Sequence, residues 1–298
     1  RWSVAHLYQA ILNREEHVKN IALLTTLSGY IHLRLTGRNV VGVGEASGMF
    51  PYDQQSGDFS AAHVERFDAL VADRGFPWKL RDILPGVLPA GAPAGVLTAE
   101  GAALLDETGL LEPGIPLCPP EGDAGTGMVA TGAVLPRTGS ISAGPSSFAL
   151  LVLERERKGC YPEIDVVATP SGQPVAMAHT NTCTSDVDDW VRLFGEFYEL
   201  MGQRTDLGKL FPKLFRKALE GEPDCGGLVS FNYFSGEPVT GTETGRPMFA
   251  RLPGGGFTLA NFMRAQLYGA IAALKLGIDL LVEQEGVETD RLLGHGGF

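Results

Sequence analysis

The hydrophobic pattern of this chain changes character near residues 122–136, and that change limits the folds it can adopt. Before this point, apolar residues recur at helical spacing, for example over residues 4–12 and 22–35. After it come short apolar runs typical of strands, and then strands that alternate with helices. This succession predicts an α/β fold. The length of 298 residues allows two domains, which we place at residues 1–122 and 123–298.

Composition and charge narrow the classes of function. The chain is 44% hydrophobic and 20% charged, which indicates a globular protein. Its formal net charge of −11 disfavours nucleic acids and anionic membranes as partners, because few basic groups remain to neutralise phosphates. Nucleotides stay compatible, since backbone N–H groups and glycines usually hold them. No apolar run is expected to reach membrane-spanning length, and no signal peptide is expected.

The cysteines are Cys118, Cys160, Cys183 and Cys225. They are far apart and form no C-x-x-C pair, so a zinc site is not expected. In a chain of this length they are typical of reduced thiols in a cytosolic protein, and we therefore predict a cytoplasmic location.

Several elements are of interest because candidate site residues lie on or beside them. A helix is predicted over residues 128–134, after a glycine-rich loop. Ser185-x-x-Asp188 resembles a capping box and predicts the start of another helix. Residues 228–234 predict a buried strand, and Leu292-Leu293 predict a strand that leads into a glycine loop.

One carboxylate, Asp123, lies inside the glycine-rich segment Gly122-Asp123-Ala124-Gly125-Thr126-Gly127. Glycines let a substrate approach the backbone, and a helix N-terminus after the segment would favour anions. A carboxylate beside a sugar hydroxyl can accept the hydroxyl proton as its oxygen attacks phosphorus. The alternative is an ordinary turn in which Asp123 bonds its own backbone.

Two further glycine-rich segments are candidates for binding a nucleotide. Residues 142–147 lie between two predicted strands and can present N–H and O–H donors to phosphate oxygens, with an ordinary hairpin turn as the alternative. Residues 294–297 follow a predicted strand, which is common at nucleotide sites, with a flexible tail as the alternative. Gly42-x-Gly44-x-x-x-Gly48 lacks the spacing of a dinucleotide motif, and we reject that interpretation.

The order of these motifs resembles the FGGY carbohydrate kinases, in particular their xylulokinase-like branch. The resemblance covers essentially the whole chain, and the ordered set is specific although each motif alone is weak. It rests on Gly122–Gly127 followed by Arg137-Thr138-Gly139-Ser140-Ile141-Ser142-Ala143-Gly144-Pro145-Ser146-Ser147-Phe148. Further similar segments are Arg34-Leu35-Thr36-Gly37, Glu45-Ala46-Ser47-Gly48, Phe234-Ser235-Gly236-Glu237 and the stretch from Phe257 to Lys275.

The resemblance implies an actin-like ATPase fold of two ribonuclease-H-like α/β domains. Residues 1–122 would then belong to the sugar-binding domain and residues 123–298 to the nucleotide-binding domain. It implies ATP-dependent phosphorylation of a sugar hydroxyl, with a ketopentose such as xylulose favoured, ATP and Mg²⁺ as cofactors, and a homodimer as a compatible assembly. Asp123 matches the catalytic base, and no residue is assigned to a metal. The residues matched to the nucleotide are Gly144, Pro145, Ser146, Ser147, Ser185, Gly294, Gly296 and Gly297. The residues expected to contact the sugar are Asp123, Ala124, Trp2 and Phe148.

Some features depart from the pattern of that family. Ala124 replaces a polar residue, and Pro145 replaces a threonine, which removes an N–H and a hydroxyl from the phosphate loop. The family's initial D-x-G-T-x-x-x-R motif does not precede Arg1, and the rest of its adenosine loop does not follow Phe298. We therefore expect a chain cut at both ends, with low or no activity. A binding scaffold without catalysis and another ATPase of the actin-like fold stay open as alternatives.

Overall fold

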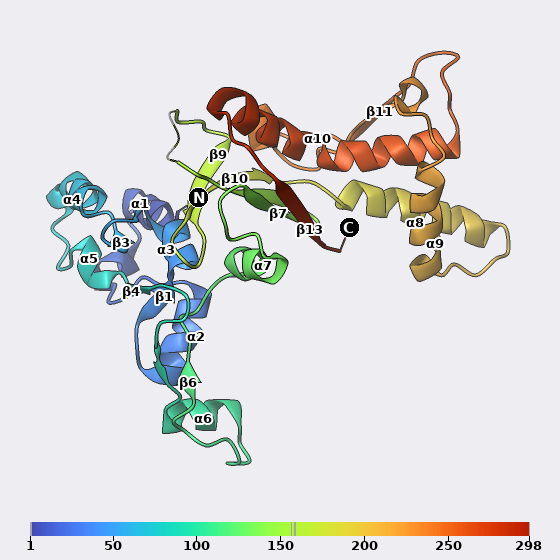
Figure 1. The fold of residues 1–298 in the computed structure, drawn as a ribbon. Coiled ribbons are helices and arrows are strands. Elements are labelled where there is room, and N and C mark those ends of the chain that lie inside the picture. The colour runs from blue at the N-terminus through green and yellow to red at the C-terminus, as the bar shows by residue number, and fades with distance from the viewer. Residues whose placement is uncertain (1, 156, 158, 298) are drawn as a thin grey trace. The chain divides into compact units, whose positions relative to one another are not determined.

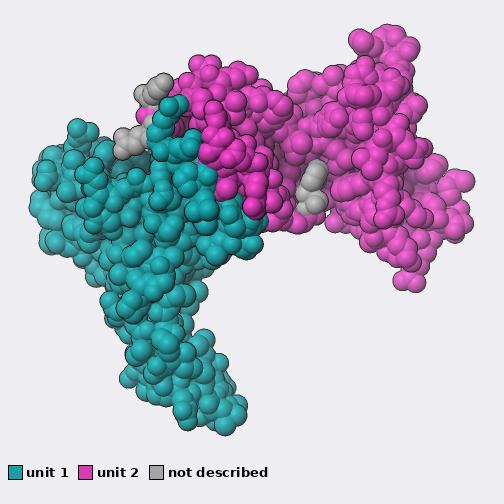
Figure 2. Space-filling model, viewed as in Figure 1, with its two compact units in different colours: residues 1–136, 152–155, 166–175 teal, residues 137–151, 156–165, 176–298 magenta. Residues whose placement is uncertain are grey.

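The computed structural model describes residues 2–155, 157 and 159–297 (Figure 1). Contacts between residues divide the chain into two compact units, which Figure 2 draws in teal and magenta. Unit 1 comprises residues 1–136, 152–155 and 166–175, and unit 2 comprises residues 137–151, 156–165 and 176–298. The outer limits of the predicted domains, residues 1 and 298, lie outside the described residues. The predicted division after residue 122 stays a prediction.

Unit 1 is built mainly from helices joined by short strand pairs. Its helices are α1 (Ser3–Leu12), α2 (Leu27–Thr36), α3 (Val43–Met49), α4 (Ala61–Leu70), α5 (Leu80–Ile83), α6 (Ala99–Leu105) and α7 (Asp123–Thr131), with 3₁₀ turns η1 (Glu16–Asn20) and η2 (Ala72–Arg74). Strand β1 (Val40–Gly42) runs parallel to β4 (Gly86–Leu88). The antiparallel pairs are β2 (Tyr52–Asp53) with β3 (Asp58–Phe59), and β5 (Gly95–Val96) with β6 (Pro116–Leu117).

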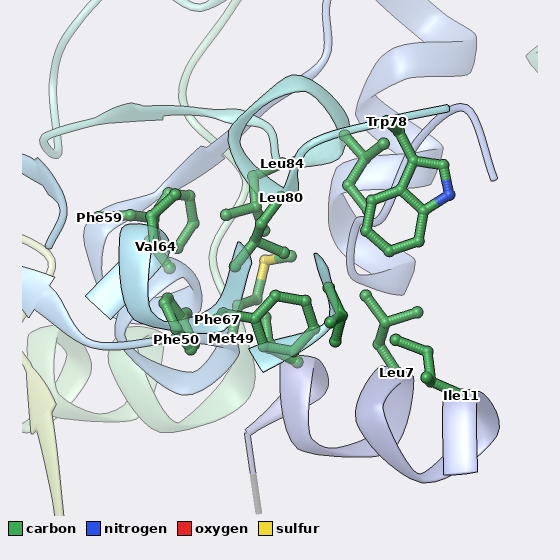
Figure 3. Close-up of a cluster of buried hydrophobic side chains, with 14 of the residues drawn as sticks. Leu7, Ile11, Met49, Phe50, Phe59, Val64, Phe67, Trp78, Leu80 and Leu84 are labelled. Carbon is green, nitrogen blue, oxygen red and sulfur yellow. The ribbon is translucent and has the colours of Figure 1, made fainter. Parts of the chain in front are cut away.

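The core of unit 1 joins apolar side chains from α1, α3, α4, α5 and β3 and from the segments that flank them. Figure 3 shows them packed together: Leu7, Ile11, Met49, Phe50, Phe59, Val64, Phe67, Trp78, Leu80 and Leu84. Trp78 also donates its Nε1–H to the carbonyl oxygen of Val18 at 2.9 Å, so its polar atom is satisfied inside the core. Leu80 is fully buried, and truncating such a side chain to alanine costs about 2–5 kcal/mol.

Threonine and glycine set the ends of α2. The sequence predicts a start at residue 22, whereas the helix begins at Leu27, because Thr26 Oγ1 accepts a hydrogen bond from the N–H of Gly29 at 3.1 Å. The helix ends at Thr36, where Gly37 takes the left-handed conformation with φ 72°. The helix predicted over residues 4–12 is confirmed as α1.

Unit 2 begins with strands and continues with alternating helices and strands, as the sequence predicts. Its elements are β7 (Thr138–Ala143), β8 (Ser147–Val152), β9 (Ile164–Ala168), β10 (Pro174–Thr180), α8 (Ser185–Leu200), α9 (Leu207–Ala218), η3 (Cys225–Gly227), β11 (Val229–Phe231), η4 (Pro238–Thr240), β12 (Met248–Ala250), α10 (Leu259–Glu285) and β13 (Arg291–Gly296). The main sheet has the strand order β13-β7-β8-β10-β9, and some residues of β8, β9 and β10 are assigned to unit 1. Strands β7 and β8 are antiparallel, and β13 runs parallel to β7.

The longest helix of unit 2 is α10, which contacts α8, α9 and β11. Thr258 Oγ1 caps it by accepting from the N–H of Asn261 at 3.2 Å, and Gly286 ends it with φ 65°. By length and composition alone α10 could cross a membrane, which differs from the expectation that no apolar run is long enough. Of its most apolar 18-residue window, 44% is buried inside the protein.

The structure corrects three local predictions. Residues 228–234 do not form a buried strand: β11 covers only Val229–Phe231, pairs with β12, and leaves Val229 47% exposed. Ser185 is not the cap of α8, because it is the first residue of the helix, and the N-cap residue Thr184 makes no side-chain capping hydrogen bond. The glycine loop predicted after Leu293 is instead the second half of β13, where the backbone pairs with β7.

Candidate active site

Asp123 is the first residue of α7 and its side chain is exposed. The sequence predicts a loop here and a helix from Met128, but the glycine-rich segment is itself the first turn of the helix. Gly122 is the N-cap residue in extended conformation, and the hydroxyl of Thr126 donates to its carbonyl oxygen at 3.0 Å. The carboxylate of Asp123 therefore lies at a helix N-terminus, where a negative side chain is favourable.

Glu121, two residues before Asp123, has a structural role that the sequence does not reveal. Its Oε1 accepts from the N–H of Gly44 at 2.9 Å, and its Oε2 accepts from the N–H of Glu45 at 3.1 Å. These are N–H groups of the first turn of α3, so Glu121 caps that helix from a distant part of the chain. Burial, and to a lesser degree the charge of Glu45, raises the pKa of Glu121.

The residues predicted to contact a sugar occupy different environments. Ala124 is half-buried in the first turn of α7. Trp2 is 42% exposed just before α1, and its ring meets that of Phe50 edge to face at 6.0 Å between centroids. Phe148 is a half-buried residue of β8, opposite Ser142 in β7. Their contacts with a sugar stay predictions.

The predicted phosphate segment, Gly144 to Ser147, is the tight turn between β7 and β8. The N–H of Gly144 donates to the carbonyl oxygen of Ser146 at 3.0 Å, and Pro145 is exposed at the tip. Ser147 is fully buried, and its Oγ shares a hydrogen bond of 2.7 Å with Oγ1 of Thr180. The hydroxyl of Ser147 is therefore not exposed to a ligand at this turn.

The start of α8 is bound to this turn through the backbone. The N–H of Cys183 donates to the carbonyl of Pro145 at 2.9 Å, and the N–H of Thr184 donates to that of Gly144 at 3.0 Å. Asn232, itself buried, donates to the carbonyl of Cys183 at 3.2 Å. These bonds bring Ser185, the first residue of α8, next to the turn that the sequence assigns to phosphate.

The predicted nucleotide glycines near the C-terminus reach the same turn through β13. Gly294 pairs with Ile141 and Gly296 with Ala143, and the N–H of Gly297 donates to the carbonyl of Ala143 at 3.0 Å. Gly296 has φ 122°, and a Cβ there would lie 2.1 Å from that same carbonyl oxygen, so only glycine fits. Unit 2 thus brings residues 144–147, 185 and 294–297 together, although they are far apart in the sequence.

A metal cage made of protein side chains is not evident. Within residues 2–155, 157 and 159–297, no three His, Cys, Asp or Glu side chains gather where they could hold a metal ion. In nucleotide sites Mg²⁺ is held largely by phosphates and water.

Comparison with known families decides the class of this chain. Residues 139–298 match the C-terminal domain of the FGGY family of carbohydrate kinases. The match spans more than half of the 298 residues. The chain belongs to the FGGY family of carbohydrate kinases. The prediction made from the order of the motifs is therefore confirmed. No protein with a curated function matches this FGGY chain in sequence.

Solved structures similar to this FGGY chain establish its fold. Xylulose kinase from Rhodospirillum rubrum is 22% identical with a TM-score of 0.73, and the alignment covers 99% of this chain and 55% of that one. Xylulose kinase from Bifidobacterium adolescentis is 20% identical, with a TM-score of 0.69 and coverage of 99% and 58%. Glycerol kinase from Plasmodium falciparum with ADP is 14% identical, with a TM-score of 0.70 and coverage of 98% and 54%. The predicted actin-like α/β fold is confirmed, and the chain spans somewhat more than half the length of these kinases.

Proposed function

We propose that this FGGY chain takes part in ATP-dependent phosphorylation of a sugar hydroxyl, with a ketopentose such as xylulose as the favoured acceptor. The observation that carries the proposal is the meeting of residues 144–147, 185 and 294–297 at Ala143, within the region that matches the family. Similar structures include enzymes described as xylulose, gluconate and glycerol kinases, which supports a polyhydroxylated acceptor. The glycerol kinase was solved with ADP, which supports ATP as the phosphoryl donor.

Asp123 is the proposed general base. Its exposed carboxylate would accept the proton of the sugar hydroxyl while the hydroxyl oxygen attacks the γ-phosphorus of ATP. The new bond joins the sugar oxygen to phosphorus, and the bond to the β–γ bridging oxygen breaks, so ADP leaves. Such a base contributes about 10²–10⁴-fold in rate. The position of Asp123 on a helix, rather than in a loose turn, supports a fixed direction for this carboxylate.

The turn from Gly144 to Ser147 is the proposed phosphate-binding element. Since the Ser147 hydroxyl is engaged with Thr180 and the Gly144 N–H with the carbonyl of Ser146, the donors proposed for a phosphate are the hydroxyl and N–H of Ser146 and the backbone N–H groups of the first turn of α8. Gly144 and Gly294 are suited to this role because a Cβ at either position has no close contact and a ligand can approach the backbone.

A cytoplasmic location is part of the proposal. All four cysteines are unpaired in the structure, with Cys118 and Cys160 exposed and Cys183 and Cys225 buried. Exposed free thiols are typical of a reducing compartment.

The experiment is a phosphoryl-transfer assay with ATP labelled at the γ-phosphate, run on the protein as its source expresses it. Xylulose, ribulose, gluconate and glycerol are the acceptors, and labelled sugar phosphate is separated from labelled inorganic phosphate. We expect transfer to at least one acceptor, with xylulose the best. Binding of ATP and sugar by calorimetry without any sugar phosphate would contradict the proposal and favour a binding scaffold.

A further inference from the structure

We propose that Glu121 is a positioning residue that holds the base-bearing start of α7 against α3. This inference rests on the proposed role of Asp123. The separation between Glu121 and its two partners, 76 and 77 residues, makes it a long-range link rather than a local turn. Both carboxylate oxygens are used, one for Gly44 and one for Glu45.

Two glycines at the start of α3 make room for this carboxylate: Gly42, its N-cap residue, and Gly44, in its first turn. A Cβ at Gly42 would lie 2.3 Å from Oε1 of Glu121, and a Cβ at Gly44 would lie 2.5 Å from Oε2. Neither position tolerates a side chain while Glu121 is in place. The N–H of Gly42 also donates to the carbonyl of Pro120 at 2.8 Å, so backbone and side chain of the 120–121 segment bind the same helix start.

The same carboxylate also bounds the first turn of α7. Gly125 is buried there, and a Cβ on it would lie 3.1 Å from Oε2 of Glu121 and 3.2 Å from Cγ of Pro170. Gly122, the cap of α7, lies beside the carboxylate of Glu45, whose Oε1 would be 3.0 Å from a Cβ. Asp123 follows directly, so the direction of its carboxylate depends on how Glu121 is anchored.

Charge adds a measurable signature. Glu45 of α3 is the charged group that faces Glu121, and its own Oε1 accepts from the hydroxyl of Ser28 at 2.8 Å. Burial and Glu45 raise the pKa of Glu121 above the ordinary glutamate value. On acidification Glu121 therefore gains a proton earlier than an ordinary glutamate, and it then loses one of its two acceptor oxygens.

The test compares wild type with Glu121→Gln, Asp123→Asn and the matched control Glu112→Gln, an exposed glutamate of the same unit. Glutamine keeps the shape but offers one acceptor, so one of the two helix N–H groups loses its partner. We expect kcat to fall about 10–100-fold in Glu121→Gln, with the KM for sugar and for ATP within about threefold of wild type. The acid limb of the kcat–pH profile should become shallower, because one ionisation is removed. Glu112→Gln should match wild type.

Three outcomes separate the claims. Loss of kcat together with a simpler pH profile in Glu121→Gln supports the positioning role. A wild-type kcat and pH profile in Glu121→Gln, with Asp123→Asn inactive, overturns the positioning role and leaves the base in place. A fully active Asp123→Asn overturns both. Amide hydrogen exchange distinguishes a local loss of anchoring from general unfolding. In Glu121→Gln, exchange should be faster than in wild type at Gly44, Glu45 and the first turn of α7, and it should be unchanged along α10.

Discussion

Arg137 donates two hydrogen bonds to the carboxylate of Asp290, from Nε to Oδ2 at 2.8 Å and from Nη2 to Oδ1 at 2.7 Å. Arg137 directly precedes β7, and Asp290 directly precedes β13. Glu288 binds the same guanidinium, and the N–H of Asp290 donates to the carbonyl of Arg137 at 2.7 Å. The pair therefore fixes the register of the strand that carries the predicted nucleotide glycines.

Arg137→Lys should loosen the parallel pairing of β13 with β7. Lysine cannot make the two-pronged contact, while it leaves the backbone at residue 137, with φ 64°, as it is. We expect faster amide exchange along residues 291–296 and a lower midpoint of thermal unfolding. The difference from wild type should shrink at high salt. Arg74→Lys, at an exposed pair with Asp73, is the control. An unchanged rate of amide exchange in β13 would show that the backbone hydrogen bonds between β13 and β7 set the register without Arg137.

Asp106 should contribute to acid stability. Its carboxylate accepts from the hydroxyl and N–H of Thr108 and from the N–H groups of Leu110 and Leu111, and these bonds lower its pKa from 3.8 to about 2. Because the folded pKa is depressed, its stabilising effect is present above pH 3.8 and is lost as the pH falls through about 2. Acid unfolding followed by circular dichroism should show a weaker pH dependence over this window in Asp106→Asn. Equal slopes in the two proteins would refute the role.

Asp186 should destabilise the folded state at neutral pH. It is buried in the first turn of α8, and burial raises its pKa although Trp190 donates a hydrogen bond to it. A raised pKa means that the fold favours the protonated acid, so its contribution is most favourable below the ordinary value of 3.8 and is lost as the pH rises. Asp186→Asn should therefore raise the free energy of unfolding at pH 7 and give no gain below pH 3.8. The control is Asp188→Asn in the same turn, and a loss of stability in Asp186→Asn at pH 7 would contradict the argument.

Gly42 and Glu121 should be energetically coupled. Gly42→Ala places a methyl group against the Glu121 carboxylate and should cost about 1–3 kcal/mol in the free energy of unfolding. The double variant Gly42→Ala with Glu121→Ala has no such collision. Its loss in the free energy of unfolding should therefore be about 0.5–3 kcal/mol smaller than the sum of the losses in the two single variants. Gly48→Ala, within the helix α3 that Gly42 precedes, is the control, since a Cβ there meets nothing within 4 Å. Additive costs in urea unfolding would show that the two residues do not interact.

The sequence predicts local features of this fold well. Val4, Leu7 and Ile11 are buried because their spacing follows one face of a helix, which is a local property of the sequence. Asp123 could be singled out from its glycine neighbours and from the order of motifs. The sequence does not reveal that Asp123 lies inside a helix, because Ala124 to Gly127 are compatible with a loop or a helix. The packing of Gly125 against Glu121 and Pro170 favours the helix.

Contacts between distant segments could not be predicted in the same way. The cap of α3 comes from Glu121, far along the chain, and no pattern near Gly44 indicates it. Residues 294–296 are strand because β7 offers them a parallel partner, whereas their glycines alone favour a loop. Residues 229–231 are half exposed because β12 pairs with them outside the main sheet, which an apolar run cannot reveal.

The role of Asp123 as the base is tested by the rate of sugar phosphate formation by Asp123→Asn, relative to wild type and to the exposed control Asp73→Asn. We expect kcat to fall about 10²–10⁴-fold in Asp123→Asn, with ATP binding unchanged and thermal unfolding lowered only slightly by loss of the charge at the helix N-terminus, and no fall in Asp73→Asn. Sugar phosphate formed by Asp123→Asn at the wild-type rate would contradict the assignment of Asp123 as the base.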